Sequence, residues 1–166
     1  MGHMRFSNEE ATVHGGVVGL STANQLVLWS LRHWFQCFSE GASATEDLDK
    51  AYGYAQARKA VAPFELTMML FVAGHQRGLS VHLPTCHGIS RDEIAFQCLI
   101  EASQNRDAHI AHKILNDMIG PVARRIVWQP LSDYANALAR AGMAVRTPQP
   151  GHKSMTTLAT LSGAVH

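Results

Sequence analysis

Apolar and polar residues follow one another along most of this chain with the three- and four-residue spacing of helices. In the first apolar segment, for example, Leu31, Trp34, Phe35 and Phe38 recur at that spacing. The pattern predicts helices over 23–38, 44–60, 63 to 74 or 78, 91–104, 108–119 and 121–141. Residues 79–83 alternate instead and predict a short extended arm. We therefore expect an all-α fold, a single compact bundle of five to seven helices.

Capping residues set the expected helix boundaries. Three segments have the Ser/Thr-x-x-Glu/Gln spacing of a capping box, in which a side-chain oxygen and an acid or amide satisfy exposed backbone amides. They are Thr22–Gln25, Ser43–Glu46 and Ser90–Glu93, and Asp107 is suited to cap the helix after it. Helix ends are expected at Gly41, Gly120–Pro121 and Gly142, and Pro130 is expected to divide the last helical segment.

The helical pattern divides the chain into three parts. Residues 1–20 are polar and glycine-rich and predict an N-terminal arm, in which Met1–His3 resembles a cloning scar. Residues 21–146 form the helical domain. Residues 147–166 combine proline and glycine with Ser and Thr, lack periodicity, and predict a flexible tail.

Two helical segments are more apolar than one buried face requires. The segment 23–38 contains Trp29, Trp34 and Phe35, and the segment 63–74 contains Met68, Met69 and Phe71. Methionine and aromatic residues are enriched at interface cores and in ligand pockets. These side chains are our candidates for contact with a ligand or a protein partner, with ordinary core packing as the alternative.

The low content of charged residues also favours contact with a partner. Only 16% of the residues are charged, against an average of about 25%, and the net charge is +1. A surface with few charges favours a homo-oligomer or a protein partner. The arginines at 124, 125, 140 and 146 are the best candidates for a DNA-binding surface, but they are few and Asp133 lies among them. A nucleic-acid role is therefore a secondary alternative.

Three cysteines at wide spacing argue against a disulfide framework and favour a reducing compartment. The early residues include Glu9 and Glu10 and lack the apolar core of a secretory signal. No run of about 18 apolar residues exists, so we expect no membrane span and a cytoplasmic location.

A metal site is the main alternative, because the chain contains ten histidines. Cys86 and His87 lie in a predicted loop, and His109 and His112 are spaced to share one helix face. Thiolate and imidazole can hold zinc or another transition metal in a tetrahedron, with His82 as a reserve ligand. The spacing matches no zinc-finger pattern, and otherwise we expect no cofactor.

Candidate catalytic residues are few. His33 and Cys37 are four apart on one helix, a spacing that could place a base beside a thiol, but apolar surroundings raise the pKa of a thiol and make it inert. We therefore expect a non-enzymatic, regulatory binding protein that acts through apolar helix surfaces. The alternatives are a metal-binding protein or metal-dependent enzyme, and a small DNA-binding regulator.

Overall fold

The computed structural model describes residues 19–147. The predicted arm (1–20) and tail (147–166) therefore lie almost wholly outside the described residues. The described part is all-α, as predicted, with six α-helices. They are α1 (Thr22–Glu40), α2 (Thr45–Tyr54), α3 (Val61–Gly74), α4 (Arg91–Gln104), α5 (Ala108–Met118) and α6 (Pro121–Arg140), with a 3₁₀ turn η2 (Arg58–Ala60) before α3.

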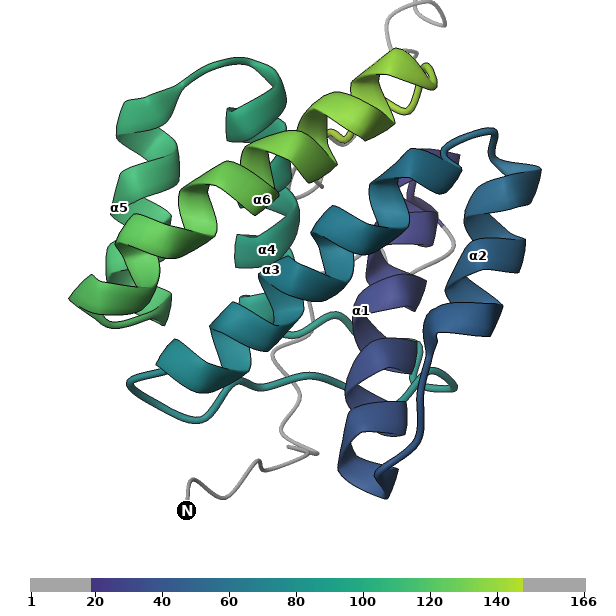
Figure 1. The fold of residues 1–166 in the computed structure, drawn as a ribbon, viewed down its shortest axis with the longest axis horizontal. Helices are drawn as coiled ribbons and strands as arrows, with labels where there is room; N and C mark the ends of the chain where they lie inside the picture. The colour runs from purple at the N-terminus through teal and green to yellow at the C-terminus, as the bar shows by residue number, and fades with distance from the viewer. Residues whose placement is uncertain (1–18, 148–166) are drawn as a thin grey trace, which may run out of the picture.

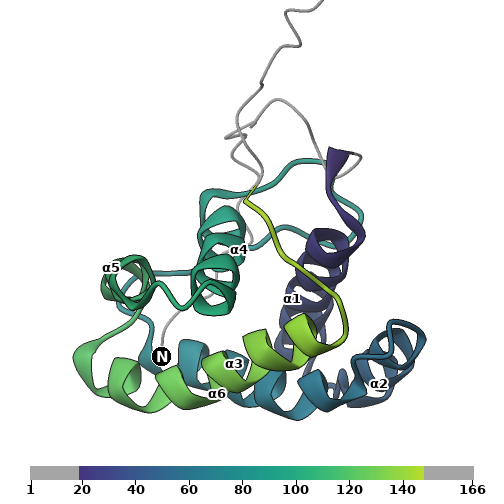
Figure 2. The same cartoon turned by 90° about the horizontal axis from the view of Figure 1, so that it is seen from above.

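Helices α3 and α6 run antiparallel side by side and form one layer (Figure 1). Seen from above, α1, α4 and α5 lie on one side of this layer, and α2 lies at its edge (Figure 2). A glycine permits the close approach of α3 and α6. A Cβ atom added at Gly74 would lie 2.1 Å from the Cβ of Ala123, and the amide of Gly120 donates to the Gly74 carbonyl at 2.8 Å.

The core lies between the two layers and is filled by large apolar side chains. Fully buried members include Leu28, Leu48, Phe64, Met68, Phe71, Phe96, Leu99, Ile100, Leu115 and Ile119. Two tyrosines are buried with them, and their hydroxyls share a hydrogen bond of 2.8 Å between Tyr52 on α2 and Tyr134 on α6. Burial raises the pKa of Tyr52 to about 12 and holds that of Tyr134 well above its usual value.

Two of the predicted helix starts are confirmed. The Ser90 hydroxyl accepts from the Glu93 amide while the Glu93 carboxylate accepts from the Ser90 amide, a complete capping box. The Asp107 side chain accepts from the Ile110 amide at the start of α5. Both caps consist of local contacts, which a sequence pattern can specify.

The other two predicted capping boxes are wrong. The N-cap of α1 is Ser21, one residue before the predicted threonine, and its hydroxyl accepts from the Asn24 amide. The N-cap of α2 is Ala44, which has no side-chain acceptor. Ser43 instead accepts from the amide of Thr45. Neighbouring cap-forming residues make the pattern ambiguous by one position.

Four helices end in the same left-handed turn. One residue has a positive φ: the C-cap itself in α1, and the residue after the C-cap in the other three helices. Its amide donates to the carbonyl three residues back, and the next amide donates to the carbonyl five residues back. Glycine occupies this position after α1 and α6, at Gly41 and Gly142, as predicted. After α2 and α4 the same position is taken by Gln56 (φ 56°) and Arg106 (φ 59°).

The left-handed turn at Gln56 explains why the predicted helix 44–60 was too long. Helix α2 ends at Tyr54, the chain reverses, and η2 leads into α3 at Val61. The sequence does not predict a left-handed turn at a glutamine, because glycine is the residue expected in that conformation.

Pro130 does not divide the last helix, contrary to the prediction. Helix α6 continues from Pro121 to Arg140 with Pro130 inside it. Proline removes one backbone donor from the helix. Buried residues on both sides of it, Val127 and Leu131 among them, hold the two halves against the core.

Candidate interaction surface

Most of the predicted contact residues lie in the core. Trp34 is 6% exposed, Phe35 3%, Met68 0% and Phe71 1%. These four side chains are covered by the chain itself, so the alternative of ordinary core packing describes them. Two further members of the predicted set reach the surface. Trp29 is half-buried and stacks on His33, and Met69 is 52% exposed.

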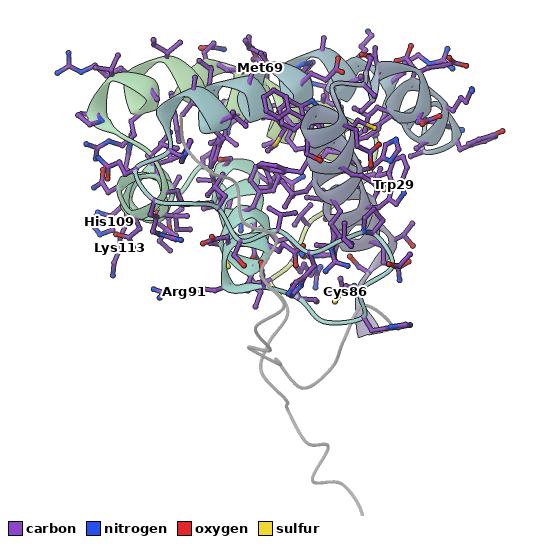
Figure 3. The ribbon with its side chains drawn as sticks, turned by 90° about the horizontal axis from the view of Figure 1, so that it is seen from below. Trp29, Met69, Cys86, Arg91, His109 and Lys113 are labelled. Carbon is purple, nitrogen blue, oxygen red and sulfur yellow. The ribbon has the colours of Figure 1, made fainter. Side chains whose placement is uncertain are left out.

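Met69 belongs to an apolar surface on α3 and α6. Figure 3 shows Met69 on the outer side of the α3–α6 layer, away from α4 and α5. Leu66 lies one turn earlier on the same face of α3 and is also 52% exposed. On α6, Val122 is 73% exposed and Ile126 55%. We call these four residues the α3–α6 face.

The two halves of the α3–α6 face lie on helices that pack against each other. Val122 directly precedes Ala123, whose Cβ contacts the Gly74 backbone at the end of α3, and Ile126 follows one turn later. The exposed alanines Ala62 and Ala73 extend the α3 stripe in both directions. The other large exposed apolar side chains of the described chain lie on other elements: Phe38, Tyr54, Leu83 and Ile110.

The composition of α3 indicates an exposed apolar face, but the sequence does not show which side chains of the helix are exposed and which are buried. Glu65 is the only charged residue among the 14 of this helix. A helix that is apolar on every side is buried all round or presents an apolar surface. Met68 and Phe71 were predicted as contact residues beside Met69, whereas Leu66, Val122 and Ile126 were not singled out.

The predicted metal ligands do not come together. Cys86 is half-buried in the loop before α4, His87 is exposed beside it, and His109 and His112 are exposed on α5. Figure 3 shows Cys86 and His109 on different sides of the molecule. His112 stacks on Trp128 at 4.8 Å between ring centroids. Within residues 19–147 no three His, Cys, Asp or Glu side chains are grouped so that they could hold a metal ion.

The reserve ligand His82 has a different environment. Its ring is 8% exposed, and Nδ1 lies 3.4 Å from the buried Oε2 of Glu93. The backbone amide of His82 donates to Oε1 of the same carboxylate at 3.0 Å. The His82 side chain is therefore packed against the first turn of α4, where it helps to hold the preceding loop.

The His33–Cys37 pair is in contact but is not arranged as an activated nucleophile. Nε2 of His33 lies 3.7 Å from the Cys37 sulfur and 2.9 Å from Oδ2 of Asp47. The same nitrogen thus faces both groups, whereas a base held by a carboxylate uses its two nitrogens separately. Burial, and then the charges of Glu40 and Asp47, raise the pKa of the Cys37 thiol. The thiol therefore stays protonated near neutral pH.

The arginines considered for DNA binding are spread along the molecule. Arg125 is exposed near the start of α6 and Arg140 near its end. Fifteen residues of helix separate them by about 22 Å. Arg146 lies beyond α6, where its backbone exchanges hydrogen bonds with the Asn24 side chain. The four residues therefore do not form one compact basic patch.

No protein-family model, curated protein or solved structure matches this chain. In the part of the chain that the structure describes, no helix is both long enough and apolar enough to cross a membrane. Among residues 19–147, four of the eight large exposed apolar side chains belong to the α3–α6 face.

Proposed function

We propose that this protein is a non-enzymatic, cytoplasmic interaction protein that forms a homo-oligomer through the α3–α6 face. The observation that carries the proposal is the exposure of Leu66, Met69, Val122 and Ile126 on two adjoining helices. Exposed apolar side chains grouped on neighbouring helices are typical of protein–protein contact sites. The three free thiols at Cys37, Cys86 and Cys98 support a reducing compartment.

A second copy of the chain fits this face because an apolar surface is complementary to itself. In a two-fold symmetric dimer the same face of each subunit meets its equivalent. Each half-exposed aliphatic side chain that loses its remaining contact with water contributes about 1 kcal/mol, and a dimer counts every such side chain twice. The small residues Ala62 and Ala73 at the ends of the α3 stripe allow the partner backbone to approach closely.

The first test is the molar mass in solution, measured by light scattering across a range of micromolar concentrations. We expect the wild-type chain to reach at least twice its monomer mass of 18.1 kDa. The double variant Met69→Lys/Ile126→Lys should be monomeric, because each lysine would bring an unpaired charge into the apolar contact. Because both replaced side chains are about half exposed, the variant should stay folded and keep the helical circular dichroism spectrum of the wild type.

A matched control is available on α5. Ile110 is 47% exposed, close to the 55% of Ile126, but it lies outside the α3–α6 face. Ile110→Lys should leave the molar mass unchanged. A wild-type protein that stays monomeric at high micromolar concentration would refute self-association. Dissociation by Ile110→Lys as readily as by the double variant would show that the contact lies elsewhere.

A further inference from the structure

A pocket of about 520 Å³ lies where the C-terminal ends of α2 and α6 meet the turn η2. Figure 1 shows this region, where the end of α6 approaches the connection between α2 and α3. Small-molecule sites commonly have volumes of about 300–1,000 Å³. The pocket is large enough for a small organic ligand, and it includes none of the four residues of the α3–α6 face.

The charged residues that line the pocket are all basic. Arg58 and Lys59 come from η2 and Arg140 from the last turn of α6, and no Asp or Glu of the described residues lines the pocket with them. All three side chains are exposed, and none forms an ion pair or a side-chain hydrogen bond within residues 19–147. A single cation near a helix C-terminus stabilises the helix dipole. Three around one recess also create a positive potential that attracts anions.

Gly53 makes room for one of these cations. It lies inside α2, where glycine is unfavourable for helix formation. A Cβ atom at this position would lie 2.7 Å from Nη2 of Arg58. The absence of a side chain therefore allows the Arg58 guanidinium to lie against the backbone of α2, at the wall of the pocket.

The turn after α2 brings the basic residues to the same wall. Gln56 has a φ of 56°, and the amide of Ala57 donates back to the carbonyl of Tyr52. This left-handed turn reverses the chain, so Arg58 and Lys59 follow immediately beside the end of the helix. A non-glycine residue in this conformation is uncommon. Gln56 is one of the residues that line the pocket.

We propose that this pocket binds a small molecule that carries a phosphate or diphosphate group. Guanidinium groups match phosphate oxygens through paired hydrogen bonds, and a lysine ammonium adds a mobile positive charge. A diphosphate carries several negative charges in a small volume and can contact Arg58, Lys59 and Arg140 together. The proposal is independent of self-association, because the two sites share no residue.

Isothermal titration calorimetry with sodium pyrophosphate at low ionic strength tests the proposal. We expect saturable binding with one site per chain, weakened by added salt. Each of Arg58→Gln and Arg140→Gln should raise the Kd about tenfold, the effect of one charged hydrogen-bond donor. Arg125→Gln removes another exposed arginine of α6 that lies outside the pocket and should leave the Kd unchanged.

The variant Gly53→Ala separates a binding defect from a folding defect. Alanine favours the helix, so the melting temperature should stay the same or rise. The added methyl group displaces the Arg58 guanidinium, so the Kd for pyrophosphate should increase several-fold. Equal weakening by Arg125→Gln, no saturable binding at millimolar pyrophosphate, or equally tight binding of citrate would overturn the proposal.

Discussion

The guanidinium of Arg32 and the carboxylate of Glu93 form a buried, bidentate ion pair that joins the middle of α1 to the first turn of α4. Nε lies 2.7 Å from Oε1 and Nη2 lies 2.9 Å from Oε2, and the two side chains are 2% and 0% exposed. Arg32 also donates to the carbonyls of Cys86 and Gly88. A pair so deeply buried is tolerated because its hydrogen-bonding groups find partners.

The same carboxylate holds the loop before α4. Glu93 accepts hydrogen bonds from the backbone amides of His82 and Ser90. Its neighbour Asp92 is 3% exposed, binds the Arg77 guanidinium through both oxygens, and accepts from the amide of Ser80. Two adjacent acids in the first turn of one helix thus position a loop that has no regular secondary structure over most of its length.

Removing one partner of the ion pair should be costly. Arg32→Met keeps much of the side-chain volume but leaves the Glu93 carboxylate buried without its counter-charge. We expect a loss of about 3–5 kcal/mol in the free energy of unfolding. Urea denaturation followed by circular dichroism measures it. Lys50→Met, which breaks the exposed pair with Glu46, should leave the urea midpoint unchanged, and an equally small effect of Arg32→Met would contradict this account.

The buried tyrosine pair should make the protein sensitive to alkali. In the folded state the pKa of Tyr52 is raised to about 12, above the ordinary value of 10.0 that it has when unfolded. The stability that results from this difference is complete below pH 10 and is lost as the pH rises towards 12. Urea midpoints measured at intervals across this range should fall steadily.

Two variants test the contribution of Tyr52. Tyr52→Phe should make the alkaline decline shallower without abolishing it, because Tyr134 stays buried with a raised pKa. At neutral pH the variant costs about 1–3 kcal/mol because the Tyr134 hydroxyl loses its buried partner. Tyr54 is 90% exposed, and Tyr54→Phe should reproduce the wild-type pH profile. If Tyr52→Phe retained the full wild-type decline, Tyr52 would not contribute to the alkaline sensitivity.

The contact between Gly74 and Ala123 should tolerate a methyl group on one side only. Gly74→Ala places a Cβ 2.1 Å from that of Ala123, so α3 and α6 must separate at this crossing. We expect a destabilisation of about 1–3 kcal/mol from overpacking. In an Ala123→Gly background the same substitution should be neutral or stabilising. A double-mutant cycle from thermal unfolding measures the coupling, and strictly additive effects would contradict the contact.

Relief of backbone strain at the end of α4 should stabilise the protein. Arg106 has a φ of 59°, a conformation that costs an L-residue about 1–2 kcal/mol and glycine much less. Arg106→Gly should therefore raise the free energy of unfolding by about 0.5–1 kcal/mol, after the added chain entropy is subtracted. The neighbouring Asn105 has a φ of −82°, and Asn105→Gly should destabilise instead. Chemical denaturation of both variants provides the comparison.

Helix starts show where sequence reasoning succeeds and where it becomes ambiguous. The boundaries of α4 and α5 were predicted to within a residue, because the side chains of Ser90, Glu93 and Asp107 bond to amides only three positions away. At α1 the threonine at position 22 and Ser21 are both good caps, and the structure uses the serine. A local sequence predicts the capping hydrogen bond of a helix when only one residue near the helix start can act as the N-cap.

Helix ends without glycine could not be predicted. Glycine is the residue expected in a left-handed turn, so the turns at Gly41 and Gly142 could be predicted. The same conformation at Gln56 and Arg106 could not, because these residue types do not indicate it. Pro130 gave the opposite error, since it predicted a break that packing against the core overrides. In each of these cases tertiary contacts outweigh a local preference of about 1–3 kcal/mol.

By itself the sequence determined the helical class, the approximate helix positions, and the fact that α3 is more apolar than a single buried face requires. Periodicity and caps are sums of short-range preferences, so they need no knowledge of the fold. The tertiary structure decided that Met68 faces the core and Met69 faces solvent, and that Arg32 meets Glu93 from 61 residues away. It also separated Cys86 from the histidines of α5 and assembled a basic pocket from residues 53 to 141. These relationships depend on how helices distant in sequence pack, and that packing is a property of the whole chain rather than of any one segment.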